Sequence, residues 1–283
     1  MSTALGSTAL GTTALGSTAL GSTALGALRR LVVAGLPLCA ALSAAPAAAQ
    51  TPVDTALVLA VDASGSIDPA EFQLQREGIA AAVTNPDLLE VIGFSPHGRV
   101  ALAYVEWGGP GTARTMVDWM MVGDAESAGA FAAAVLAAPR SLQSYNAIGD
   151  AVAHGQALLE ACPCLPGRRV IDVSGDNPDN RSIVPAPLAR NRAVAAGITV
   201  NALAILQDGF TGNRGRPWLV ENYEAEVIGG PGAFVMSANS RRDFERALLD
   251  KMILEIAWPA RPVPSGRQEV AGRELGAGVQ GDR

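Results

Sequence analysis

Hydrophobic runs and amphipathic segments alternate along the chain from about residue 50 onward. The runs are rich in Val, Ile, Leu and Ala, which is typical of strands that are covered on both faces of a sheet. The segments between them place apolar residues at helical spacing, and several begin with Asp or Pro, which favour helix starts. The predicted strands are Thr55–Val61, Arg99–Trp107, Thr115–Val122, Arg169–Val173, Ile198–Leu206 and a short one within 232–237. The predicted helices are 68–83, 124–137, 146–160, 187–196 and 241–256.

This alternation predicts an α/β fold with a doubly wound, mostly parallel sheet and helices on both faces, a three-layer sandwich. Ligands of such sheets bind at the carboxyl ends of the strands, where the winding reverses. The loops that follow the predicted strands are therefore the places where functional side chains are expected.

The amino-terminal part of the chain has a different pattern. Residues 2–26 are five copies of a five-residue unit that ends in Ala-Leu-Gly, a composition that cannot form a core. Two arginines, an apolar run over 31–45 and the small residues before Gln50 are typical of a secretory signal peptide. We expect cleavage near Ala49 and a secreted or periplasmic product. The predicted organisation is a repeat at 1–26, a signal peptide at 27–49, a folded domain at 50–258 and a flexible tail at 259–283.

Composition narrows the range of functions. The 283 residues are 49% hydrophobic, which excludes a disordered protein. The net charge of -6 and the absence of a cluster of basic residues argue against nucleic-acid binding. No later stretch of about 18 apolar residues follows the leader, so no membrane span is predicted. Cys162 and Cys164 are either two thiols or a local disulfide, since the usual redox spacing is C-x-x-C.

Three oxygen-rich segments are expected at one edge of the sheet. Asp-Ala-Ser-Gly-Ser at 62–66 follows the first strand, Ser-Gly-Asp-Asn at 174–177 follows another, and Ser-Tyr-Asn at 144–146 begins a helix. They offer carboxylate, hydroxyl and amide oxygens and no His or Cys, a donor set that suits Mg²⁺, Mn²⁺ or Ca²⁺ rather than zinc. Alternate residues of an extended segment share a side, so Asp62, Ser64 and Ser66 are expected to face the same point.

The D-x-S-x-S pattern at 62–66 resembles the metal-ion-dependent adhesion site (MIDAS) of the von Willebrand factor type A domain. Asn146 stands where that family has a Thr, and Gly149 falls at the family's next offset. Asp176 matches the third element, although Asn177 replaces the family's Gly. The resemblance covers 53–257 and implies the family's Rossmann-like sandwich. The phrases VIDVSGDNP, VIGGPGAFV and YVEW are more similar still to an uncharacterised bacterial family of secreted von Willebrand A-like proteins.

The resemblance implies a role for each matched residue. Ser64 and Ser66 would bind the metal through their hydroxyls, while Asp62 and Asp176 would act through waters or by holding those hydroxyls. Asn146 would bind through its amide oxygen, but it equally fits the N-cap of the helix that follows. In this family an acidic residue of a protein partner completes the metal shell, so the site binds rather than catalyses. The predicted function is a secreted, divalent-metal-dependent binding module with no catalytic residues, its oligomeric state left open.

The alternative is a secreted hydrolase that uses the same Asp/Ser cluster, either with a metal or with Ser64 or Ser174 as nucleophile and His97 or His154 as base. The G-x-S-x-G pattern of acyl hydrolases fails at Ser64, because Asp stands two residues before it. No feature of the sequence brings either histidine near a serine. Asp172, inside a predicted strand, is expected to be hydrogen-bonded rather than catalytic.

Overall fold

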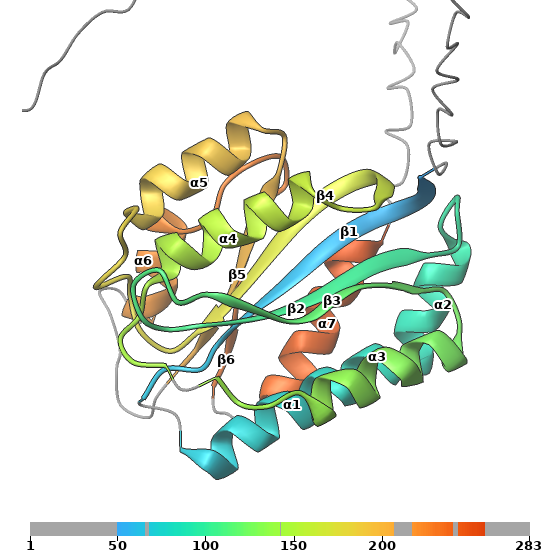
Figure 1. The fold of residues 1–283 in the computed structure, drawn as a ribbon, viewed down its shortest axis with the longest axis horizontal. Helices are drawn as coiled ribbons and strands as arrows, with labels where there is room; N and C mark the ends of the chain where they lie inside the picture. Colours follow the sequence, from blue (N-terminus) through green and yellow to red (C-terminus); the bar gives the residue numbers. More distant parts are fainter. Residues whose placement is uncertain (1–49, 66–67, 142, 207–216, 240–242, 258–283) are drawn as a thin grey trace, which may run out of the picture. The chain divides into compact units, whose positions relative to one another are not determined.

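The computed structural model describes residues 50–65, 68–141, 143–206, 217–239 and 243–257, and Figure 1 shows their arrangement. Six strands form one sheet in the order β3-β2-β1-β4-β5-β6. Neighbouring strands are parallel except at one edge, where β3 runs antiparallel to β2. The strands are β1 (Thr51–Asp62), β2 (Val100–Trp107), β3 (Arg114–Val122), β4 (Cys164–Gly175), β5 (Thr199–Ile205) and β6 (Val235–Ala238).

Helices cover both faces of the sheet, as Figure 1 shows. Along β1, Val58 and Ala60 face the core beneath α4, α5 and α6, while Leu57 and Leu59 face the core beneath α1, α2, α3 and α7. This alternation explains why the strand reads as a continuous apolar run, and the predicted doubly wound sandwich is confirmed. The helices are α1 (Pro69–Thr84), α2 (Pro86–Phe94), α3 (Ala125–Ala137), α4 (Ile148–Glu160), α5 (Ala186–Ala195), α6 (Trp218–Glu226) and α7 (Phe244–Ile256).

The structure adds elements that the pattern did not predict. Helices α2 and α6 are absent from the sequence prediction, and β4 begins at Cys164 because its first residues pair with the start of β1. Cys162 and Cys164 are joined in a buried disulfide at this point. No helix in the described part of the chain is long and apolar enough to cross a membrane. The predicted repeat, signal peptide and tail lie outside the described residues.

The winding reverses between β1 and β4, the two central strands. The chain passes from β1 to β2 on one side and later returns to β4 on the other. The two strands pair along ten register positions and end together, with Val61 opposite Ser174. The loops that leave them therefore diverge from one crevice, which is where ligands of such sheets bind.

Candidate metal centre

Two carboxylates meet where β1 and β4 end. Asp62 and Asp176 are both buried, and the Ser64 amide donates to Asp62 Oδ1 over 2.7 Å. Burial raises the pKa of the Asp62 carboxyl to about 7, and the nearby Asp176 carboxylate adds to the rise, whereas hydrogen bonding from Ser64 opposes it. When both carboxyls are ionised they repel each other, and a cation beside them would relieve that repulsion.

Aromatic side chains close the base of this crevice. A Cβ at Gly175 would lie 2.7 Å from the Tyr223 hydroxyl and 3.1 Å from the Trp107 ring, so only glycine fits there. The Tyr223 hydroxyl donates to the carbonyl of Asn177 over 2.9 Å. Burial and then the charge of Asp62 raise the pKa of Tyr223, which keeps the phenol neutral beside the carboxylates.

Asn146 is held between the loops that follow β2 and β4. The amide of Ala147 donates to the Gly108 carbonyl over 2.7 Å, and a Cβ at Gly108 would lie 3.3 Å from Ser64 Cα. On the other side, the backbone N–H of Asn146 donates to the side-chain Oδ1 of Asn180 over 3.1 Å, and the backbone N–H of Asn180 donates to the backbone carbonyl of Asn146 over 2.9 Å. These contacts bring Asn146 next to the Ser64 segment and to the loop that begins with Asp176.

The structure argues against the helix-capping role of Asn146. Ser182 caps α4, since its hydroxyl oxygen accepts the Gly149 amide over 2.8 Å and the Asp150 amide over 3.4 Å. The side chain of Asn146 makes no capping bond, and its Oδ1 is buried without a hydrogen-bond partner among the described residues. A buried amide oxygen left in this state is costly unless a ligand satisfies it.

Tyr145, directly before Asn146, has a strained backbone. Its φ of 67° is the one left-handed value at a non-glycine position in the described ranges, and its ring is half exposed. The guanidinium of Arg181 lies 5.0 Å from the ring centroid. A bulky residue in this conformation typically marks a functional segment whose surroundings hold it in place.

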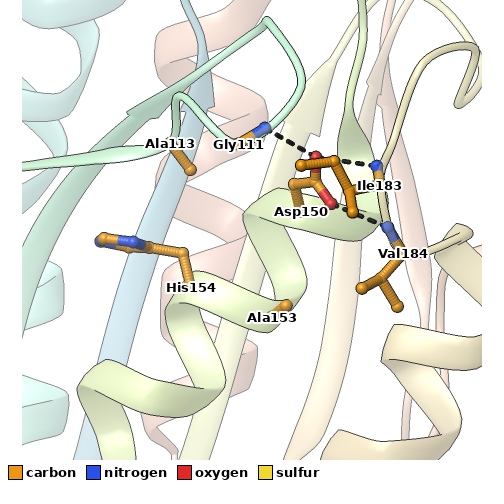
Figure 2. A pocket seen from close by; sticks show the side chains of 7 residues that line it. All are labelled: Gly111, Ala113, Asp150, Ala153, His154, Ile183 and Val184. Atoms are coloured by element: carbon orange, nitrogen blue, oxygen red, sulfur yellow. Dashed lines mark hydrogen bonds between the residues drawn. The ribbon is translucent and has the colours of Figure 1, made fainter. Parts of the chain in front are cut away.

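Asp150 holds the surrounding loops together and was not singled out by the sequence. Figure 2 shows its carboxylate accepting three backbone amides: Gly111 over 2.8 Å, Ile183 over 3.0 Å and Val184 over 3.0 Å. A Cβ at Gly149 would lie 1.9 Å from the Val184 carbonyl oxygen, which explains the glycine in the motif. The only sequence signal for Asp150 was an acidic residue in the first turn of a helix.

Glu106, at the end of β2, is a second organising residue that the sequence reasoning missed. One carboxylate oxygen accepts from Arg76 over 2.7 Å and from the Tyr104 hydroxyl over 2.9 Å. The other accepts the amide of Ser141 over 2.7 Å and its hydroxyl over 2.5 Å. Because Ser141 begins the segment that leads to Asn146, this network fixes the approach to the candidate site.

Four of the five predicted ligands lie in this crevice: Asp62, Ser64, Asn146 and Asp176. Ser66 lies outside the described residues. Among the described residues, no three His, Cys, Asp or Glu side chains form a metal-binding group. Hydroxyl and amide oxygens would therefore have to complete any cation shell here, as the sequence predicted for a hard cation.

The two histidines of the alternative hydrolase contact other residues. The backbone amide of His97 donates to Asp54, near the start of β1, and eight residues of strand put that point about 26 Å from Asp62. His154 lies on α4 with Nε2 2.9 Å from the Thr115 hydroxyl. Ser174 is buried within β4. Asp172 is paired with Lys251 at 2.8 Å, in line with its predicted structural role.

Comparison with solved structures agrees with the fold. The pilus adhesin SpaC of Lactobacillus rhamnosus GG is 17% identical over 74% of this chain and 31% of its own, with a TM-score of 0.52. Proximal thread matrix protein 1 of the mussel byssus, with a zinc-occupied MIDAS motif, is 17% identical over 72% of this chain and 46% of its own, with a TM-score of 0.52. A von Willebrand factor type A structure from Catenulispora acidiphila is 15% identical over 72% of this chain and 43% of its own, with a TM-score of 0.49.

The protein therefore shares the fold of the adhesin and of the thread protein with its MIDAS motif, and the von Willebrand A-like resemblance drawn from the sequence is confirmed at the level of the fold. It belongs to the family described as "Protein of unknown function (DUF1194)", which matches residues 52–260. No curated relative matches the sequence. The chain spans about a third to a half of the length of the adhesin and thread-protein chains it resembles.

Proposed function

We propose that this protein is an exported binding module that holds one divalent cation at the crevice and through it binds a carboxylate of a protein partner. Ser64, Ser66 and Asn146 would supply direct oxygen ligands, with Asp62 and Asp176 holding the hydroxyls or bound waters. The cation would neutralise the carboxylate pair and leave a coordination position for an acidic side chain. Oxygen donors without His or Cys favour Mg²⁺, with Mn²⁺ and Ca²⁺ as substitutes.

The observation that carries this proposal is the amide oxygen of Asn146. It is buried, lacks a hydrogen-bond partner in the described structure and lies beside the Ser64 segment and the loop of Asp176. A cation would satisfy this oxygen and offset the repulsion between the two carboxylates at once. The adhesin and the zinc-bound thread protein with the same fold support the assignment as a metal-dependent binding module.

The test is thermal unfolding of the purified full-length chain with EDTA and then with millimolar Mg²⁺, Mn²⁺ or Ca²⁺. A cation that binds only the folded state, at a concentration 100 times its Kd, stabilises the folded protein by about 2.7 kcal/mol and thereby raises Tm. Asp62→Ala combined with Ser64→Ala should abolish the rise, and Asn146→Ala should remove most of it.

Asn85→Ala is the matched control. Asn85 caps α2 through a 2.9 Å bond from the Asp87 amide, so its loss lowers Tm with and without metal but leaves the metal-dependent rise intact. No rise with any of the three cations would overturn the proposal. So would a rise that survives in the double variant.

A further inference from the structure

A pocket of about 300 Å³ opens between α4, the residue before β3 and the loop that leads into α5. Figure 2 shows the side chains that surround it, with Ala113, Ala153 and His154 toward one side and Ile183 and Val184 toward the other. The alanines leave the space open because their side chains are short. Ile183 is 71% exposed, so its side chain is available to contact a group seated in the pocket.

The polar groups of the pocket are already engaged. The Asp150 carboxylate accepts three backbone amides, so its charge is largely compensated and it has little capacity left for a ligand cation. His154 pairs with the Thr115 hydroxyl, and burial lowers the pKa of the imidazole, which favours the neutral ring. Methyl groups line most of the remainder. The pocket therefore suits an uncharged, apolar group.

The pocket and the metal centre share two segments of the chain. In the loop after β2, Gly108 packs against Ser64 and Gly111 lines the pocket. At the entrance to α4, Asn146 belongs to the metal centre and Asp150, four residues later, to the pocket. The step from Asn146 to the N-cap Ala147 spans about 3.8 Å, and the first turn of α4 from Ala147 to Asp150 spans about 5 Å, so the two residues lie at most about 9 Å apart, which is the span of two or three residues of an extended peptide.

We propose, on the basis of the metal centre proposed above, that this pocket binds an apolar side chain of the partner segment whose carboxylate ligates the cation. The two side chains would lie two or three residues apart in an extended peptide. The exposed Arg181, stacked on Tyr145 beside the same crevice, adds a positive charge that complements an acidic segment. The partner is thus a peptide segment with an acidic and an apolar residue at this spacing.

The experiment titrates soluble acetylated glycine heptapeptides into the isotope-labelled full-length chain in Mg²⁺. Each peptide carries one Asp. In the test peptides a Leu stands two or three residues before or after the Asp, and in the reference peptides a Gly takes the place of the Leu. Burial of the Leu side chain should tighten binding about tenfold at the best spacing relative to the Gly reference. Replacing Asp by Asn, or adding EDTA, should abolish binding of both peptides.

Ala153→Leu fills the pocket from α4 and should make the Leu and Gly peptides equal, while the Mg²⁺-dependent rise in Tm is retained. Ala157→Leu is the matched control, because Ala157 is exposed one turn further along the same helix. The two histidines give a readout that needs no variant: the Leu peptide should shift the ring resonances of His154 and leave those of His97 unchanged.

The outcomes separate the two proposals. If Mg²⁺ binds but Leu gives no advantage, if no peptide binds, or if Ala153→Leu keeps the preference, the pocket proposal is overturned and the metal centre stands. If the protein binds no divalent cation at all, the proposed function fails and the pocket proposal falls with it. Should Ala153→Leu not fold, unchanged His154 resonances in the wild-type protein would also overturn the pocket proposal.

Discussion

Two pairs of buried acidic residues lie at the central sheet, and β4 or the residue just after it contributes one member to each. Asp172 on β4 and Glu255 on α7 share Lys251 of the same helix, whose Nζ lies 2.8 Å from Asp172 Oδ1 and is also hydrogen-bonded to Glu255 Oε1. Asp62 and Asp176 meet at the carboxyl edge, where Asp62 accepts the amide of Ser64. The cation of the first pair is the ammonium group of Lys251, whereas we propose that the second pair takes a divalent cation from solution.

Both pairs must offset the repulsion between two buried carboxylates, the first with a lysine of the fold and the second, as we propose, with a bound ligand. In each pair, the pKa of one carboxyl is raised to about 7, chiefly by burial and then by the neighbouring carboxylate. Beneath α7, Lys251 opposes the rise, and Asn201 supplies a further hydrogen bond to Glu255 over 2.8 Å. A pair whose charge is matched internally stabilises the fold, whereas a pair arranged for a ligand stabilises it fully only when the ligand is bound.

The largest effect expected from this comparison is at Lys251. Lys251→Met removes the cation and leaves two buried carboxylates without it, which should lower the free energy of unfolding by about 3–5 kcal/mol. Urea unfolding of the metal-free chain measures this loss. The control is Arg246→Met on the same helix, whose ion pair with Asp250 at 4.0 Å is exposed, and it should change stability by less than about 0.5 kcal/mol. Equal effects of the two variants would refute the assigned role of Lys251.

The fold could be predicted because its signals are local. Continuous apolar runs marked the central strands, and Gly or Pro marked their ends. Helix α2 was missed although Asn85 and Pro86 are ordinary start signals, because it is short and follows α1 directly. Helix α6 buries only Leu219, Val220 and Tyr223, too few residues for a clear periodic pattern.

The candidate site was predictable only as far as a contiguous motif could show it. The pattern around Asp62 and Ser64 and the position of Asp176 at the end of a strand were readable from the sequence. The role of Asn146 depends on Ser182, which caps α4 in its place. The Asp150 carboxylate accepts hydrogen bonds from backbone amides of residues far away in the sequence. Because nearly every residue has such an amide, the sequence does not show which ones Asp150 contacts.

The pH dependence of stability sharpens the comparison from the side of Glu255. Its pKa is raised from the ordinary 4.5 to about 7, so between these pH values the folded state retains a proton that the unfolded state has lost. The stability that the protonated Glu255 carboxyl contributes to the folded state is fully present below pH 4.5 and is lost as pH rises through about 7. The free energy of unfolding should fall by about 1–3 kcal/mol over this window.

Glu255→Gln should remove that share of the pH dependence, because the amide stays neutral throughout. Denaturant unfolding in EDTA at a series of pH values, wild type against variant, isolates it from the contribution of Asp62, which is present in both proteins. Parallel curves for the two proteins would show that Glu255 does not titrate in this window and that the carboxylates beneath α7 are held ionised by Lys251.

The smallest expected change is a gain in the free energy of unfolding, and it concerns Asp176 at the carboxyl end of β4. Asp176→Asn removes one of two repelling buried charges, while its side-chain oxygen can still accept the 2.8 Å bond from Asn177 Nδ2. In EDTA the variant should therefore be more stable than wild type, by about 1 kcal/mol, and in Mg²⁺ it should lose most of the metal-dependent rise in Tm. Asp118→Asn, an exposed change of the same net charge, should leave both values unchanged. A loss of stability in EDTA would mean that Asp176 is a structural partner like Asp172, and the distinction between the two pairs would disappear.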